Sequence, residues 1–203
     1  LKKGETTVTL IEPSRFPERI APLFYAVSMA QKALLIVDQI NPAFGEIVIM
    51  LDCIGLKEGI VVLKNYISRE QIAPLIKNTV VDGYEFLEED KNLLRERFLE
   101  DAAKVVSPQD AATGTLPVDH FFNVRGIGTV VLGSLAEGSI KKHDVLMALP
   151  GEKTAQVRSI QKHDQDFDTA GVGERTGIAL KGIEVEDLDR GTILTNDKSI
   201  KQV

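Results

Sequence analysis

The hydrophobic pattern of the first half of the chain switches between continuous apolar runs and runs with helical spacing. Residues 33–37 and 60–63 are continuously apolar, which is typical of strands buried on both faces of a sheet. Between them, apolar residues from Phe44 to Ile54 recur every three to four positions and predict a helix, with Gly55 as its C-cap. Strands that alternate with helices in this way indicate a parallel sheet.

Further elements of the first half follow from the same pattern. The β-branched run at residues 6–11 predicts a strand, and residues 79–84 predict a last one. Helices are expected at residues 18–31 and 69–77, and a long terminal helix follows Asp90, whose side chain can cap it. Four apolar residues of this last helix share one face: Leu94, Phe98, Ala102 and Val105.

The second half is a series of short β-rich runs at near-regular spacing. The expected strands are residues 118–124, 129–135, 145–149, 155–160, 175–180 and 193–194. The turn signals between them are Glu137-Gly138, Pro150-Gly151 and the stretches 164–168 and 171–173. Such spacing favours a closed antiparallel barrel, which leaves no sheet edge exposed.

A stretch with prolines, a glycine and no apolar periodicity separates the two halves. We therefore predict an α/β domain with a parallel sheet at residues 1–107, a linker at 108–116 and an all-β closed antiparallel barrel at 117–203. A chain of 203 residues is long enough to give both domains a core. Barrel closure also predicts that the second domain folds alone.

Composition narrows the function classes. Hydrophobic and charged contents of 43% and 27% are ordinary for a globular protein, and the net charge of −6 argues against coating nucleic acid by bulk electrostatics. Recognition of one RNA end through a shaped pocket stays open. The single cysteine, Cys53, favours a reducing cytosol, and no apolar run approaches the roughly 18 residues of a membrane helix. We expect a cytoplasmic location without a membrane partner, and Leu1 in place of Met leaves room for upstream sequence.

Metal and nucleophile chemistry finds little support in the sequence. The three histidines, His120, His143 and His163, are scattered and lack a partner at ligand spacing. The acidic stretch at residues 164–168 lacks the glycine and the terminal glutamate of a calcium loop, and no Gly-x-Ser-x-Gly elbow exists. We therefore expect no metal site and no catalytic residue.

Two β-rich runs between Val118 and Gly133 flank the corner Arg125-Gly126-Ile127-Gly128. Because glycine lacks a Cβ atom, the backbone there can turn sharply and a flat ligand can lie against it. A barrel that needs glycine at its corners would give the same pattern, so the residues alone leave both interpretations open.

This corner resembles the start of the second domain of translational GTPases of the elongation factor Tu class, and archaeal selenocysteine-specific elongation factors in particular. Later motifs recur in the expected order at residues 138–144, 157–161, 170–175, 180–183 and 187–191. The resemblance implies an elongation-factor-like role in protein biosynthesis, a GTP-binding fold in the first half and a six- or seven-stranded barrel in the second.

The family's nucleotide motifs can then be sought in the first half. The phosphate loop, Gly-x-x-x-x-Gly-Lys-Ser/Thr, is absent from the chain, and its place would lie before Leu1. The positions that match the two other motifs are Glu12, Arg15, Phe16, Lys64, Asn65 and Ile67. Arg15 stands for the glycine that approaches a γ-phosphate, Phe16 for the catalytic histidine and Ile67 for the aspartate that reads guanine.

These substitutions predict a degenerate GTP-binding domain that neither binds nor hydrolyses GTP, so no cofactor is expected. The alternative is a GTPase whose phosphate loop lies upstream, with GTP and Mg²⁺ as cofactors and a divergent guanine site. A protein-interaction remnant is a third interpretation.

In the elongation factor Tu class, the second domain contributes a pocket for the terminal adenosine and aminoacyl ester of tRNA. The resemblance maps its parts onto Val124, Gly126, Ile127, Gly128, Gln161 and Ala179. Three of these depart from the Tu type: Ile127 replaces arginine, Gln161 replaces glutamate and Ala179 replaces a larger aliphatic residue. The implied partners are aminoacyl-tRNA and the ribosome, and a barrel retained for folding alone is the alternative.

Overall fold

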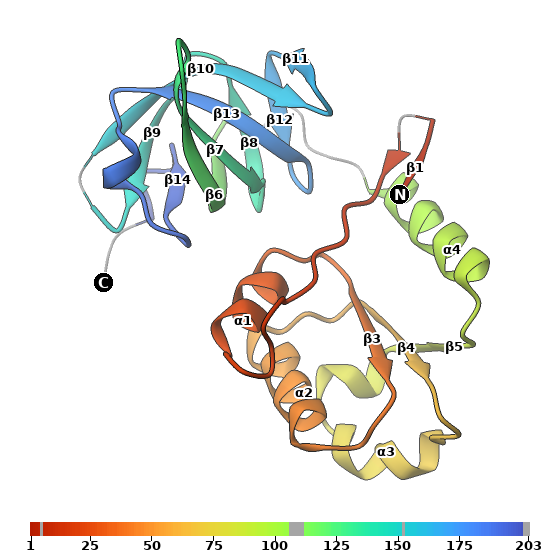
Figure 1. Cartoon of the computed structure of the whole chain (residues 1–203). Coiled ribbons are helices and arrows are strands. Elements are labelled where there is room, and N and C mark those ends of the chain that lie inside the picture. The colour runs from red at the N-terminus through yellow and green to blue at the C-terminus, as the bar shows by residue number, and fades with distance from the viewer. Residues whose placement is uncertain (5, 106–111, 152, 201–203) are drawn as a thin grey trace. The chain divides into compact units, whose positions relative to one another are not determined.

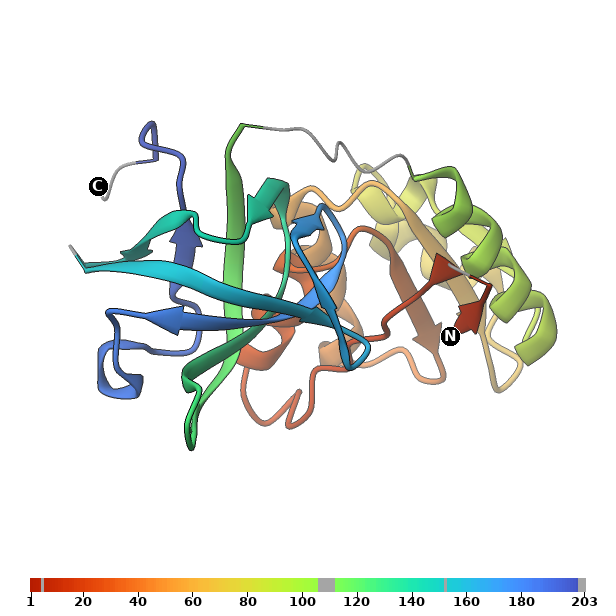
Figure 2. The same ribbon diagram turned by 90° about the horizontal axis from the view of Figure 1, so that it is seen from above.

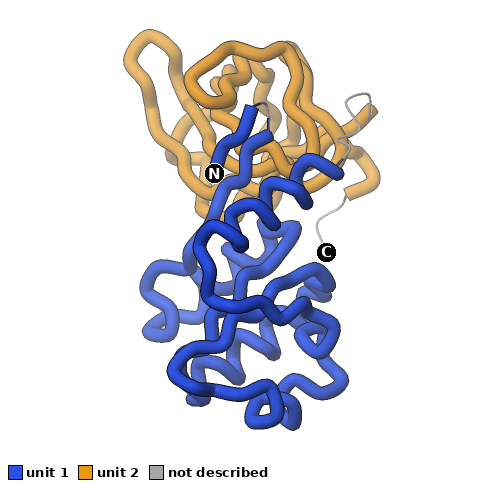
Figure 3. The backbone as a smooth tube through the Cα atoms, turned by 90° about the vertical axis from the view of Figure 1, so that its right-hand side faces the viewer, with its two compact units in different colours: residues 1–105 blue, residues 106–203 orange. Residues whose placement is uncertain are grey.

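The computed structural model describes residues 1–4, 6–105, 112–151 and 153–200 (Figure 1). The chain forms two compact units, residues 1–105 and 106–203 (Figure 3). The first is an α/β unit with a parallel sheet and the second is an all-β unit, as the sequence pattern predicts.

The first unit is built on a three-stranded parallel sheet in the order β3 (Ala33–Val37), β4 (Gly59–Leu63) and β5 (Glu85–Leu87). The central strand is buried on both faces, because Ile60, Val61 and Val62 alternate between two hydrophobic clusters. This double burial explains why the strand reads as a continuous apolar run.

Four helices pack on this sheet: α1 (Ala21–Ser28), α2 (Pro42–Ile54), α3 (Arg69–Ile76) and α4 (Lys91–Lys104). Side chains from α1, α2 and α3 share one cluster with Val61, whereas Phe98 of α4 packs with Ile60 and Val62. The helices therefore cover opposite faces of the sheet.

Local signals define the helix ends. The Asn41 side chain accepts a hydrogen bond from the Phe44 amide at 3.1 Å, and Gly55 closes α2 with a left-handed φ of +74°. Asp90 accepts from the amides of Asn92 and Leu93 at the start of α4. The predicted caps of α2 and α4 are thus confirmed.

Two predicted strands of the first unit are wrong. Residues 79–84 hold a 3₁₀ turn at Val80–Gly83, and the strand comes directly after it as β5. The Asp52 carboxylate accepts a hydrogen bond from the Val80 amide at 2.8 Å, so a distant side chain overrides the β propensity of the two valines. In residues 6–11 only Thr6–Thr7 forms a strand, β2, which pairs with β1 (Lys2–Lys3) outside the parallel sheet.

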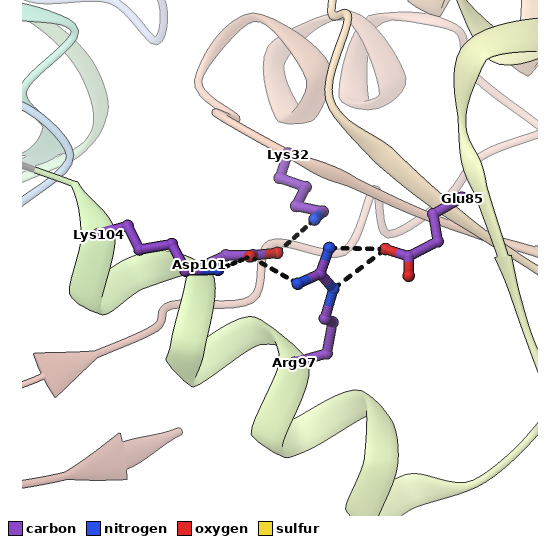
Figure 4. Close-up of polar contacts among 5 residues, drawn as sticks. All are labelled: Lys32, Glu85, Arg97, Asp101 and Lys104. Carbon is purple, nitrogen blue, oxygen red and sulfur yellow. Dashed lines mark hydrogen bonds and ion pairs between the residues drawn. The ribbon is translucent and has the colours of Figure 1, made fainter.

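An ion-pair network fastens α4 to the sheet (Figure 4). The Asp101 carboxylate lies 2.5 Å from the Lys32 amine and 3.2 Å from the Arg97 guanidinium, which also bonds to Glu85 at 2.9 Å. Burial acts to raise the pKa of Asp101, but the positive charges around it lower that pKa below its ordinary value. The network links Glu85 of β5, and Lys32 directly before β3, to one helix.

The second unit is a closed barrel of six antiparallel strands (Figures 1 and 2). The strands pair in the ring order β6, β14, β9, β10, β13, β7 and back to β6. Their bounds are β6 (Gly114–Val124), β7 (Gly128–Ser134), β9 (Val145–Leu149), β10 (Thr154–Lys162), β13 (Arg175–Lys181) and β14 (Ile193–Thr195). These are the six strands that the sequence predicts, and the closed antiparallel barrel is confirmed.

Three short strands and a 3₁₀ turn lie outside the six-stranded ring, and the sequence pattern does not predict them. They are β8 (Glu137–Lys141), β11 (Gln165–Phe167), β12 (Thr169–Gly171) and the turn at Val185–Asp187. Gly138 lies inside β8. The position requires glycine, because a Cβ atom there would be 1.8 Å from the Thr113 carbonyl oxygen. The glycine therefore permits a close strand approach in addition to its positive φ of 64°.

The domain boundary differs in part from the predicted one. Strand β6 begins at Gly114, so residues 114–116 of the predicted linker are strand residues, with Leu116 fully buried. Residues 108–111 of that linker lie outside the described residues. No helix in the described part of the chain is long and apolar enough to cross a membrane.

Candidate functional site

The glycine corner joins β6 to β7 and projects from the end of the barrel wall. Gly126 and Gly128 have φ values of +83° and +101°, and the Ile127 amide donates to the Val124 carbonyl at 3.0 Å. A Cβ atom on Gly126 would meet nothing within 4 Å, so this glycine is required by backbone conformation and not by crowding. The Ile127 side chain is 45% exposed at the tip.

An arginine from a different strand supports the corner. The Arg158 guanidinium, on β10, donates a hydrogen bond to the Ile127 carbonyl oxygen at 2.9 Å. Strand β13 lies between β10 and β7 in the ring, so this side chain reaches over a whole strand. The corner is thereby tied to the barrel wall at its tip as well as at its two ends.

Strand register shows which residues share the outer surface with the corner. Val131, Ile178 and Ile160 are fully buried on β7, β13 and β10, so their neighbours on each strand point outward. The first outward row next to the corner is Phe122, Val130, Ala179 and Ser159. The second row is His120, Leu132, Gly177 and Gln161. We call the outward side of β6, β7, β13 and β10 the outer face.

The predicted pocket residues therefore lie on one face but not at one point. Val124, Gly126, Ile127 and Gly128 are together in the corner. The Ala179 row is two residues away, about 7 Å along the strands, and the Gln161 row is about 13 Å away. Ala179 is only 4% exposed, so its methyl group is largely covered.

Gln161, at the far end of the outer face, is held by a neighbour. Its side-chain amide donates to the Asp166 carboxylate at 2.9 Å, across the β10–β11 hairpin. Small residues, Gly177 and Ala179, lie between Gln161 and the corner. The sequence thus identifies both ends of the face and one of its central residues.

A polar cluster borders the same face, and sequence reasoning missed it. Asp119 lies at a bulge in β6, where its carboxylate bonds to the guanidinium of Arg175 and lies 3.1 Å from the His120 ring. Arg190 donates to the Asp119 backbone carbonyl at 3.1 Å. The two arginines are 56 and 71 positions from Asp119, so no local motif signals the cluster.

The degenerate nucleotide motifs lie in the first unit, where several have structural roles. Phe16 and Ile67 are partly buried and pack against its hydrophobic core. The Lys64 amine pairs with Glu89 at 2.8 Å, which raises the pKa of Lys64, and the Asn65 amide donates to the Asp38 carbonyl at 3.1 Å. Glu12 and Arg15 are exposed, and Arg15 has a left-handed φ of +71°. No described group of three His, Cys, Asp or Glu side chains could hold a metal ion.

Comparison with known proteins shows which domain family the barrel resembles. Residues 128–195 match the family model of elongation factor Tu domain 2. The chain is translational GTPase-like. It is 29% identical over 212 residues to the selenocysteine-specific elongation factor of Methanocaldococcus jannaschii, covering 94% of this chain and 45% of that relative. An uncharacterized protein of the same organism is 39% identical over 197 residues, with 96% and 62% covered.

Solved structures agree with this assignment for both units. Translation elongation factor SelB from Methanococcus maripaludis, in complex with a GTP analogue, superimposes with a TM-score of 0.69 at 26% identity. The match covers 90% of this chain and 44% of that one. A bacterial selenocysteine-specific elongation factor shares the fold, with a TM-score of 0.71 at 22% identity, and 91% and 35% covered. This translational GTPase-like chain thus spans less than half the length of these elongation factors.

Proposed function

We propose that this protein acts in translation, in the cytoplasm, by binding the aminoacylated 3′ end of tRNA on the outer face of its barrel. We also propose that it does so without binding or hydrolysing GTP. The observation that carries the first part is the glycine corner, whose exposed tip opens onto a face with small residues at its centre. The ribosome is the expected second partner.

The chemistry of the face suits the end of a single RNA strand. A base offers a flat apolar surface, and such surfaces bind by stacking and van der Waals contact. Val124 and Ile127 supply apolar contacts at the corner, and the neighbouring Phe122 is 43% exposed on the same face. Gly177 and Ala179 contribute no long side chain of their own at the centre of the face, where the Leu132 side chain lies against Gly177. The covered methyl group of Ala179 implies that a ligand meets the flanking side chains first.

The proposed loss of GTP rests on where the substituted residues lie. Reading guanine requires a carboxylate at the position of Ile67, but Ile67 packs against the core of the first unit. Phe16 also packs there, and its ring cannot orient a water molecule. Lys64 already pairs with Glu89. These side chains therefore contribute to folding at positions where a GTPase places its chemistry.

Binding of aminoacyl-tRNA to the wild-type chain and to Ile127→Glu tests the first part. The substitution places a carboxylate at an exposed tip, so we expect an intact fold and affinity at least tenfold weaker, about 1.4 kcal/mol. Ile49→Glu is a control of equal charge, because Ile49 is 63% exposed on α2. Equal binding by all three proteins, or no binding by any, would overturn the tRNA assignment.

Titration with a fluorescent GTP analogue in the presence of Mg²⁺ tests the second part. We expect no binding in the micromolar range. Mg²⁺-dependent binding would instead support the GTPase alternative, with a divergent guanine site.

A further inference from the structure

A second surface feature of the barrel lies next to the corner. It is a groove of 490 Å³ lined by His143, Gln156, Val157, Arg158 and Lys181. Gln156 and Lys181 are cross-strand partners on β10 and β13, and the His143 amide donates to the Val157 carbonyl at 2.9 Å. We call this feature the basic groove.

The basic groove and the corner share one residue. Arg158 lines the groove and uses one guanidinium N–H to hold the Ile127 carbonyl. A guanidinium carries five N–H donors, so this bond leaves most of its donor capacity for a ligand. The groove is therefore adjacent to the corner at Arg158.

Several basic side chains of the barrel surface are paired with acidic side chains. Lys153, Lys162 and Arg175 are each neutralised by an ion pair with an acidic side chain. Among the described residues, neither Arg158 nor Lys181 has an acidic partner within 4 Å.

The acidic residue next to His143 in the sequence is Asp144, and its carboxylate bonds to groups that do not line the groove. The Asp144 carboxylate, next to His143, accepts from the Lys141 amide at 2.8 Å and from the Asn196 side chain at 3.2 Å. Two cations without an acidic partner in a polar groove form a site for an anion.

We propose that the basic groove binds the phosphodiester backbone of the RNA strand whose terminal nucleotide lies on the corner. This inference rests on the proposed function and adds the part of the ligand that precedes the terminal nucleotide. Arginine offers a planar fork that matches phosphate geometry, and lysine adds a point charge. The net charge of −6 argues against broad electrostatic attraction, so we expect the contact to involve only the phosphates that the groove reaches.

Lys181 is the cleaner probe of the groove, because Arg158 also holds the corner. The experiment measures fluorescence anisotropy of an aminoacylated RNA minihelix with the full chain. One RNA has natural linkages, and a second has uncharged methylphosphonates at the linkages before the terminal nucleotide. The proteins are the wild type, Lys181→Gln and the control Lys77→Gln, which removes the same charge from an exposed lysine of the first unit.

We expect Lys181→Gln to weaken binding of the natural RNA by about fivefold and to reduce the slope of log affinity against log salt by about 0.7. Neutral linkages should weaken wild-type binding, but Lys181→Gln much less, because its phosphate contact is already lost. Lys77→Gln should match the wild type in both measurements. An unchanged unfolding temperature of Lys181→Gln shows that the fold is intact.

The outcomes separate this inference from the proposed function. If Lys181→Gln binds both RNAs as the wild type does while Ile127→Glu binds weakly, the groove assignment fails and the corner assignment stands. If the wild type binds neither RNA, both fail. Equal sensitivity of wild type and Lys181→Gln to neutral linkages would place the phosphate contact elsewhere and overturn the inference.

Discussion

The Arg158 guanidinium on β10 holds the backbone carbonyl oxygen of Ile127, in the corner between β6 and β7, at 2.9 Å. Because the two residues are 31 positions apart, the geometry of the corner depends on the register of strands that do not contain it. The corner is thus a supported element of the barrel wall and not a free loop.

Arg158→Ala should loosen the corner without unfolding the barrel. A hydrogen bond of this kind contributes about 1 kcal/mol, so exchange of the Ile127 amide, which bonds to Val124, should accelerate by about fivefold. Hydrogen exchange of peptides from residues 118–133 gives the measurement. Arg125→Ala is the matched control, an exposed arginine of the same corner. Equal exchange rates in the two variants would contradict the supporting role.

Gly59→Ala should destabilise the first unit strongly. A Cβ atom at Gly59 would lie 2.1 Å from the Tyr84 ring, whose hydroxyl group donates to the Leu56 carbonyl at 2.5 Å. Moving this buried ring costs about 1–3 kcal/mol. The chain has no tryptophan, and its three tyrosines, Tyr25, Tyr66 and Tyr84, all lie in the first unit. Tyrosine fluorescence during urea unfolding therefore reports this unit alone.

Gly45 provides the control for Gly59. It lies inside α2, and a Cβ atom there would meet nothing within 4 Å. Gly45→Ala should raise the stability of the first unit by about 0.5–1 kcal/mol, because alanine is the better helix former. A loss of stability in both variants would show that the two sites do not differ as described.

Acid should weaken the first unit through Asp101. Its neighbours, Lys32 and Arg97 among them, lower its pKa in the folded state below the ordinary value near 3.9. Its contribution to stability is therefore complete above about pH 4–5 and is lost as pH falls through the lowered pKa. Asp101→Asn should cost about 1 kcal/mol at pH 7 and little at pH 2. Urea unfolding followed by tyrosine fluorescence at both pH values measures this, with the exposed Asp82→Asn as control.

The barrel should fold alone only if its first strand is complete. A fragment of residues 112–203 contains all of β6, whereas a fragment of residues 117–203 lacks Thr115 and Leu116, which pair with β14. Removing the fully buried Leu116 side chain alone costs about 2–5 kcal/mol. We expect a cooperative thermal transition by circular dichroism in the longer fragment and none in the shorter. The same transition in both would place the boundary after Leu116.

The sequence predicts features that depend on neighbours along the chain. All six ring strands and the corner at residues 124–128 follow from β-rich runs and glycine spacing. Strand β8 is missed because Gly138 reads as a turn, although the Thr113 carbonyl also requires a glycine there. The 3₁₀ turn at Val80 is missed because Asp52, 28 positions away, holds its amide.

The candidate site also contains some residues that the sequence predicts and others that it does not. Val124 to Gly128 are contiguous, so a motif reveals them. The approach of Arg175 and Arg190 to Asp119 arises only when β7 joins β6 to β13 and the chain that follows β13 returns to β6, and the basic groove arises only when β10 lies beside β13. Contacts between residues that are 25 to 71 positions apart leave no periodic trace in one sequence.

Closure of the ring also constrains the order in which the strands of the barrel can pair during synthesis. Strand β14 is the last of the six, and it pairs with β6, the first, through Thr195 and Thr115. During synthesis, some 80 further residues must therefore be added after the start of β6 before its partner β14 exists. Until then the nascent barrel has open edges on β6 and β9, where β14 will later insert. Strand β14 therefore protects the barrel from pairing with other chains at these two edges.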